Sequence, residues 1–284
     1  MRVASNRGRR LASAGEDVAG ARPKRGTPQT RSPSYRLAYA DQDFLLRDEL
    51  RPVRLQLELL KPEILLAEHR IETTIVVFGS ARIPSPEAAA PRPRRGAVLD
   101  PRRTYEAARA FARLVSRAGQ KHGRSRRLVV VTGGGPGVME AANQGAADVG
   151  AESIGLNIAL QEEQAPNRYI TPELCFQFHY FAIRKLHFML RARALVCFPG
   201  GFGTLDELFD ALTLIQTGKA APMPILLFDE TYWRRIVNFD AMVEEGVIAP
   251  ADRDLVRYVE SAEEAWRAIC SHYGLDPALA DEGS

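Results

Sequence analysis

Long apolar runs, paired cysteines and metal-binding patterns are all missing from this sequence of 284 residues. No stretch reaches the roughly 18 to 20 continuous apolar residues that a membrane helix needs, so we expect no membrane span. The three cysteines, Cys175, Cys197 and Cys270, are far apart and form no C-x-x-C pair. They indicate buried thiols in a reducing compartment, and we expect a cytoplasmic protein. The five histidines show no H-E-x-x-H or similar spacing, so no metal is expected.

Apolar residues are also scarce in residues 1–36, where nine Lys and Arg face only Glu16 and Asp17 among the acids. This segment is strongly basic, whereas the rest of the chain is mildly acidic. With so little to bury it cannot offset its ordering entropy, so we predict a disordered segment. A nucleic-acid-binding arm and an organelle transit peptide are the alternatives. The acidic remainder makes nucleic acid an unlikely partner, and the prolines of the segment oppose an amphipathic helix.

The remainder, residues 37–284, has the pattern of one α/β domain whose core starts at about residue 70. Leucines at helical spacing predict one or two helices over 41–69, which Pro52 and Pro62 divide or kink. A proline-rich insertion over 83–103 is predicted to be loop. Short apolar runs predict strands at 73–78, 128–132, 153–158, 194–198 and 224–228, and helical patterns lie at 104–121, 138–149, 178–193, 205–217, 232–245 and 262–273.

Strands that alternate with helices of this length indicate βαβ units. The predicted fold class is therefore α/β, a Rossmann-like doubly wound, mainly parallel sheet with helices on both faces. Ligands of such sheets bind at the carboxyl ends of the strands, so the turns that follow the strands are the places to look for a site.

The first such turn contains Gly133, Gly134, Gly135 and Gly137, between a predicted strand and a predicted helix. Glycines let the backbone approach a ligand, and the unpaired N–H groups of a helix start attract anions. No G-K-[ST] follows, which separates the turn from a P-loop, and the spacing differs from G-x-G-x-x-G. A tight turn without a ligand is the alternative.

The second turn, P-G-G-F-G-T-L-D-E at 199–207, again joins a strand to a helix, and both turns would face one crevice. Glu207 lies about one helical turn beyond Gly203, roughly 5.4 Å, which would bring a carboxylate near the ribose of a phosphate-bound nucleotide. The alternative is a capping box, in which Thr204 caps the helix and Glu207 reaches back to its N–H.

The helix predicted at 178–193 is apolar on most sides and reads as mostly buried. Its polar residues, Tyr180, Arg184, His187 and Arg191, fall on one face. Such a stripe points toward a specific partner, although a solvated face or a subunit contact would give the same pattern.

Three segments together resemble the Lonely Guy (LOG) family: G-G-G-P-G-V-M-E-A-A-N at 133–143, R-K at 184–185 and the second glycine turn at 199–207. The likeness extends over about residues 40–270 and includes F-G-S-A-R at 78–82. It implies a Rossmann-like fold, a homodimer or larger assembly, and a nucleoside monophosphate as substrate. The implied reaction is hydrolysis of the N-glycosidic bond of AMP-type, or cytokinin, nucleoside 5′-monophosphates to free base and ribose 5-phosphate, without a cofactor.

The resemblance also implies roles for individual residues. Arg184 and Glu207 would be the catalytic pair, and Glu140 and Lys185 are further candidates for substrate contact. Ala182 and Ile183 stand directly before Arg184, where the family often has Met-His. This departure concerns the contacts with the base. The residues implied to bind phosphate and ribose are Ser80, Gly134, Gly135, Gly201, Gly203 and Thr204.

Breaking a ribosyl N-glycosidic bond builds positive charge on the sugar, which a carboxylate beneath C1′ stabilises while it activates water. Glu207 suits that role, and Arg184 would keep its carboxylate ionised and oriented. The alternative is a binding protein on the same scaffold, a nucleotide sensor or a carrier of a phosphorylated cofactor such as molybdenum cofactor. Such a protein keeps the glycine turns but has no need of the acid.

Overall fold

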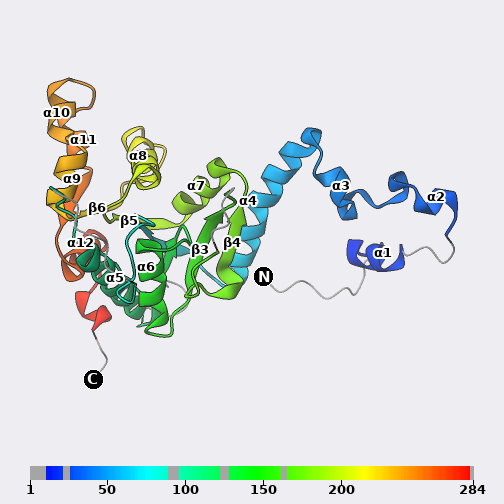
Figure 1. Cartoon of the computed structure of the whole chain (residues 1–284), viewed down its shortest axis with the longest axis horizontal. Coiled ribbons are helices and arrows are strands. Elements are labelled where there is room, and N and C mark those ends of the chain that lie inside the picture. The colour runs from blue at the N-terminus through cyan, green and yellow to red at the C-terminus, as the bar shows by residue number, and fades with distance from the viewer. Residues whose placement is uncertain (1–10, 22–25, 89–95, 122–127, 161–164, 282–284) are drawn as a thin grey trace. The chain divides into compact units, whose positions relative to one another are not determined.

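The computed structural model describes residues 11–21, 26–88, 96–121, 128–160 and 165–281 (Figure 1). Contacts divide the chain into two compact units, Met1–Glu63 and Ile64–Ser284. The division falls within helix α4 (Arg51–Glu68), whereas the sequence pattern suggests a boundary at residue 36. Among the described residues, no helix combines the length and the apolar character that a bilayer crossing requires.

The first unit consists of short helices that lead into α4. Neither α1 (Ala14–Gly20) nor α2 (Pro28–Arg31) contains a buried residue, and the disorder of residues 1–36 stays a prediction. Pro62 lies inside α4 without dividing it. The remaining elements of this unit are η1 (Pro33–Tyr35), η2 (Ala38–Ala40), α3 (Gln42–Leu45) and η3 (Asp48–Leu50).

The second unit is built on a seven-stranded sheet in the order β4-β3-β2-β1-β5-β6-β7, in which every neighbouring pair is parallel. The chain runs outward from β1 to β4 and then returns to the other side of β1, so the strand order reverses between β1 and β5. The strands are β1 (Thr73–Phe78), β2 (Leu128–Thr132), β3 (Ser153–Ile158), β4 (Cys175–Phe178), β5 (Ala192–Cys197), β6 (Ile225–Phe228) and β7 (Val256–Val259).

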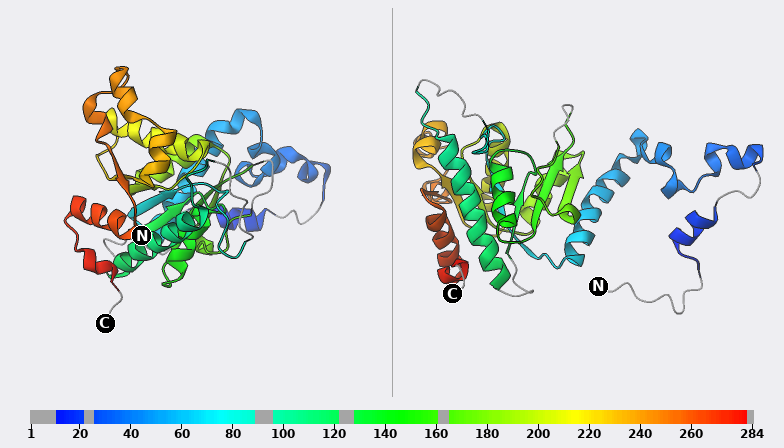
Figure 2. Two further views of the ribbon diagram at one scale, coloured as in Figure 1. Left: turned by 60° about the vertical axis from the view of Figure 1, so that its left-hand side comes forward. Right: turned by 60° about the horizontal axis from the view of Figure 1, so that its bottom comes forward.

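Helices cover both faces of this sheet (Figures 1 and 2). Alternate strand residues point to opposite faces, so Ile75 belongs to one buried cluster and Val76 to the other. The first cluster includes α5 (Pro101–Lys121), α6 (Val138–Ala147) and α12 (Ala262–Tyr273); the second includes α7 (Phe181–Leu190), α8 (Phe202–Gln216), α9 (Glu230–Ile236) and α10 (Phe239–Glu244). The predicted fold class is confirmed. Two 3-10 turns, η4 (Pro172–Leu174) and η5 (Pro277–Ala280), and the short α11 (Pro250–Arg253) complete the unit.

Several predicted elements need correction. The sequence pattern misses β4 and β7, the two edge strands of only four residues, and it assigns Phe178 of β4 to a helix that begins at Phe181. The helix predicted at 232–245 is two helices, α9 and α10. The insertion predicted to be loop over 83–103 ends in helix, because α5 begins at Pro101. Pro101 occupies the first helical position, and the Asp100 carboxylate accepts the N–H groups of Arg102 and Arg103.

Candidate active site

Three turns meet where the strand order reverses, one after each of β1, β2 and β5. Ser80, in the turn after β1, joins the other two through its backbone. Its N–H donates to the carbonyl of Pro199 over 3.0 Å, and its carbonyl accepts the N–H of Val138 over 3.1 Å. Ser80 therefore connects the end of the second glycine turn to the start of α6, which follows the first.

Packing against the Ser80 turn explains one glycine of the first turn. Gly137 has a φ of 74°, and a Cβ there would lie 2.3 Å from the carbonyl oxygen of Ser80. Only glycine fits such a close approach with a left-handed backbone. The helix α6 can thus start directly against the end of β1.

The backbone N–H and carbonyl of Gly134 both form hydrogen bonds within the protein. Its N–H donates to Thr132 Oγ1 over 3.0 Å, and its carbonyl accepts from the backbone N–H of Asn167 over 2.9 Å. The Asn167 side chain also donates to the carbonyls of Gly134 and Gly135. Because C=O and N–H point in opposite directions in a trans peptide, the Gly135 N–H points away from Asn167.

Asn167 belongs to a polar network that the sequence analysis misses. Its amide also donates to Asn143 Oδ1 over 2.9 Å, and Asn143, fully buried on α6, accepts from Thr132 and donates to Ser153. The network fixes the first turn to the end of β2 and the start of β3. Asn143 lies within the G-V-M-E-A-A-N motif, but no sequence pattern marks Asn167.

The second turn leaves open space where the first is packed. A Cβ at Gly201 or Gly203 would meet nothing within 4 Å, so glycine at these positions leaves room for something outside the chain. Thr204 is buried, with its Oγ1 only 2.1 Å from where a Cβ of Gly200 would lie. The helix α8 begins at Phe202 with Gly201 as its N-cap and no side-chain cap, which excludes the capping-box reading of Thr204 and Glu207.

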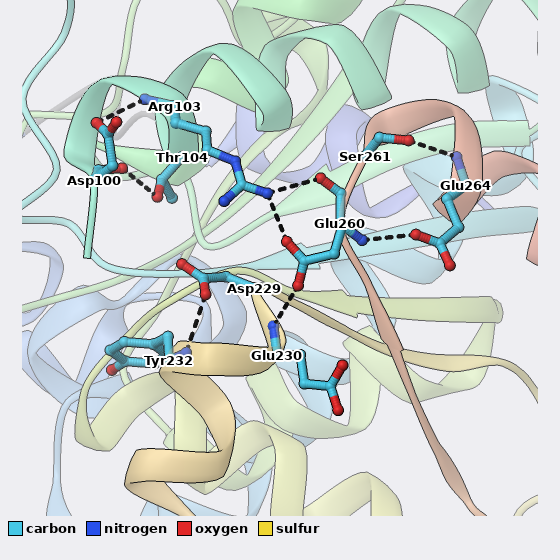
Figure 3. A network of polar contacts seen from close by, with 9 residues as sticks. All are labelled: Asp100, Arg103, Thr104, Asp229, Glu230, Tyr232, Glu260, Ser261 and Glu264. Carbon is cyan, nitrogen blue, oxygen red and sulfur yellow. Dashed lines mark hydrogen bonds and ion pairs between the residues drawn. The ribbon is translucent and has the colours of Figure 1, made fainter. Parts of the chain in front are cut away.

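Tyr232 on α9 also fixes the second turn, and the sequence analysis misses it. Its hydroxyl donates to the carbonyl of Gly200 over 2.6 Å. Figure 3 shows the network that holds the start of α9: the Asp229 carboxylate accepts the Tyr232 N–H, and Glu260 accepts both the Glu230 N–H and the Arg103 guanidinium. These bonds connect the starts of α5, α9 and α12 to the site.

Arg184 and Glu207, the predicted catalytic pair, come together from α7 and α8. Arg184 Nη2 lies 3.5 Å from Glu207 Oε1, and the exposed fractions of the two side chains are 13% and 6%. The guanidinium lies over the ring of Phe188 at 5.4 Å. Arg184 Nη2 is also 3.4 Å from the Cβ position of Gly133, which places the ion pair beside the first glycine turn.

Burial changes the protonation of this pair. It raises the pKa of Glu207 to about 7, although the charges of Arg184 and Lys185 act to lower it. Burial also lowers the pKa of Arg184, while Glu207 and Asp206 act to raise it. Arg184 therefore favours the ionised carboxylate, as expected, but desolvation outweighs the ion pair and the net change in the pKa of Glu207 is upward. A pKa near neutrality suits a general base.

Lys185 lies beside this pair and forms one of its own. Its Nζ lies 2.6 Å from Asp206 Oδ1, so two ion pairs run side by side between α7 and α8. Burial is the largest single effect and lowers the pKa of Lys185, but the bond to Asp206 and the charges of Asp206, Glu207 and Asp210 together outweigh it, so the net change is upward. Lys185 thus has a structural partner, whatever contact it makes with a substrate.

The other candidates occupy different surroundings. Glu140, in the first turn of α6, raises the pKa of Tyr105 through its charge, second to the effect of burial. His187 of the polar stripe is buried, with its ring 5.4 Å from that of Phe178, so the stripe is not a solvated face. Among the described residues, no three His, Cys, Asp or Glu side chains form a group that could hold a metal ion.

The fold and the site together define a Rossmann-like protein with a buried Arg–Glu pair between two glycine turns. A family model described as "Possible lysine decarboxylase" matches residues 139–269. Cytokinin riboside 5′-monophosphate phosphoribohydrolase LOG3 of Arabidopsis thaliana is 32% identical over 145 residues, 49% of this chain and 66% of that protein. Probable cytokinin riboside 5′-monophosphate phosphoribohydrolase LOG6 of the same plant is 31% identical over 144 residues, 49% of this chain and 70% of that protein. The chain belongs to the LOG family.

The match leaves part of each protein uncovered. The chain spans 64 to 66% of the length of the first three relatives. Among solved structures, the molybdenum cofactor binding protein of Rippkaea orientalis has a TM-score of 0.46 and 19% identity, covering 71% of this chain and 98% of its own. The Moco carrier protein of Chlamydomonas reinhardtii has a TM-score of 0.45 and 18% identity, covering 72% and 98%. Similarities of this size carry no information on function.

Proposed function

We propose that this protein hydrolyses the N-glycosidic bond of AMP-type nucleoside 5′-monophosphates, including cytokinin nucleotides, to free base and ribose 5-phosphate. The observation that carries the proposal is the buried Arg184–Glu207 pair beside the two glycine turns. A protein that only binds nucleotides has no use for a buried acid whose desolvation is unfavourable. The names of the plant relatives, cytokinin riboside 5′-monophosphate phosphoribohydrolases, support the same reaction.

The proposed phosphate site is the open start of α8 with the Ser80 turn. Gly201 and Gly203 leave room there, and the first N–H groups of a helix favour an anion. Ser80, Gly135 and Thr204 complete the proposed phosphate and ribose contacts. Gly134 contributes by shaping the turn, since its own N–H and carbonyl are already bonded.

Glu207 is the proposed catalytic acid–base group. Its ionised carboxylate would stabilise the positive charge that develops at C1′ and take a proton from the attacking water. The charge of Arg184 would keep the carboxylate oriented and favour its ionised form in the reacting complex. Each of these two groups is expected to contribute about 10² to 10⁴ in rate.

We also propose a homodimer or larger assembly in the cytoplasm. The sequence pattern predicts a mostly buried α7, but Phe181, Leu186 and Leu190 are between 42 and 52% exposed in the single chain. Leu186 and Leu190 lie one helical turn apart, and exposed apolar side chains that adjoin in this way are typical of a subunit contact. Three free cysteines, two of them buried, are in keeping with a reducing compartment.

One assay tests the reaction. Purified protein is incubated with AMP, GMP, CMP, isopentenyl-AMP and adenosine, and free base is measured by chromatography. We expect base release from AMP or isopentenyl-AMP and none from adenosine, which leaves the anion site empty. Binding of AMP without release of adenine would replace this proposal with the sensor or carrier alternative.

A further inference from the structure

A cavity of about 710 Å³ lies beside the second glycine turn, and Pro199, Gly200 and Gly201 of that turn line it. Residues of the proline-rich insertion also line it, among them Ile83, Pro86, Ala97 and Leu99. Its volume is within the roughly 300 to 1,000 Å³ of pockets that enclose small organic ligands. No residue of this insertion is among the proposed contacts for hydrolysis of a monophosphate.

The cavity is continuous with the proposed phosphate site. Ser80, Gly200 and Gly201 line it, and Ser80 and Gly201 are also proposed phosphate contacts. A phosphate bound there would therefore have open volume on its far side. A ligand that continues beyond the phosphate could occupy both places at once.

The lining indicates what such a continuation would be. Ile83, Leu99 and the prolines of the insertion give apolar surface, and Arg82 adds positive charge, whereas Arg102 is paired with Glu106. Among the described residues of the lining the one carboxylate is that of Asp100, and it already accepts two backbone N–H groups at the start of α5. A further anionic group together with a flat apolar group fits this combination.

Tyr232 offers a fixed surface for the flat group. Tyr232 lines the cavity, its hydroxyl is bonded to Gly200, and its backbone N–H is bonded to the Asp229 carboxylate. The adjacent Trp233 ring meets it edge-on at 5.5 Å. An aromatic ring held in this way can stack a nucleobase without losing conformational freedom.

We propose that the cavity binds the second half of a dinucleotide, in which the 5′-phosphate of the first nucleotide is joined through a second phosphate to another nucleoside. The second phosphate would lie near Arg82 and the second base against Tyr232. The inference uses the proposed function only in taking Ser80 and Gly201 as phosphate contacts. It does not require that the bound nucleotide be hydrolysed.

Binding is measured by calorimetry with three ligands: AMP, ADP and di(adenosine-5′) diphosphate. The full-length chain with Glu207→Gln serves as background, so that turnover does not disturb the titration. We expect the dinucleotide to bind at least about tenfold more tightly than ADP, since only the dinucleotide adds a base. Ala97→Trp, which fills the cavity from an exposed position, should remove this difference and leave AMP binding unchanged.

Val98→Trp is the matched control, because Val98 is the exposed neighbour of Ala97 and does not line the cavity. It should keep the preference for the dinucleotide. Equal binding of ADP and the dinucleotide overturns the inference, and so does a preference that survives Ala97→Trp. Failure of the wild-type protein to release adenine from AMP would overturn the proposed hydrolysis instead and leave this result standing.

Discussion

At the scale of single residues, a substitution of Glu207 distinguishes an enzyme from a protein that only binds nucleotides. Glu207→Gln keeps the size of the side chain but removes the charge that faces the developing cation. We expect turnover of AMP to fall by about 10² or more while AMP still binds, because the lost interaction belongs to the transition state. Asp210→Asn, on the same helix, is the control and should change turnover much less. Wild-type turnover by the Gln variant would remove Glu207 from the mechanism.

The same substitution should alter stability in a pH-dependent way. The pKa of Glu207 rises from 4.5 to about 7 on folding, so folding favours the protonated carboxyl group. The free energy of unfolding is therefore highest, as far as this group is concerned, below pH 4.5, and it falls as the pH rises through 7. Gln imitates the neutral acid and avoids this loss, which is on the order of 3 kcal/mol. We expect Glu207→Gln to raise the melting temperature relative to wild type at pH 8 more than at pH 4.5. A difference that is the same at both pH values would mean that folding leaves this pKa unchanged.

The residues of the site differ in how well the sequence reveals them. Arg184 and Glu207 lie in distinctive motifs, and the structure brings them within ion-pair distance. Asn167 and Tyr232 act through single hydrogen bonds to glycine carbonyls, and such bonds leave no periodic or compositional mark. The pKa of Glu207 was also out of reach, because it depends on how deeply the side chain is buried.

At the scale of elements, the charged residues near the starts of α7 and α8 set the pKa of Glu207. Lys185 lowers the pKa of Glu207 and Asp206 raises it. We therefore expect Lys185→Met to move the lower midpoint of the kcat/KM profile to higher pH, and Asp206→Asn to move it to lower pH. Both variants break the same ion pair, so a merely structural effect would change the two in the same direction. The measurement is AMP hydrolysis from pH 5 to 9.

The elements themselves are predictable where a long period or a buried run defines them. The limits of β1, β2 and β3 agree with the sequence pattern, since their β-branched runs end at turn residues. The strands β4 and β7 are too short for alternation to be counted, and only pairing with β3 and β6 makes them strands. Helix α8 begins earlier than expected because Phe202 and Gly203 join it despite weak helix preference.

At the scale of the whole molecule, the exposed face of α7 is the best place to test assembly. Leu190→Glu puts a charge on this face, and we expect it to shift a dimer toward monomer in light scattering after gel filtration. Val247→Glu is the matched control, because Val247 is 68% exposed and lies after α10. Dimers unaffected by Leu190→Glu would require another contact surface.

The reversal of strand order at β1 also sets the order in which the chain can fold. Val76 of β1 lies opposite Leu195 of β5, yet β2, β3 and β4 are all synthesised between them. A ribosome takes about 6 to 24 s to add the roughly 120 intervening residues. During that interval one side of β1 has no strand beside it and is open to wrong pairing. The contact that joins the two glycine turns through Ser80 therefore forms late in synthesis, when β5 arrives, and the folding of this protein is most exposed to aggregation before its site exists.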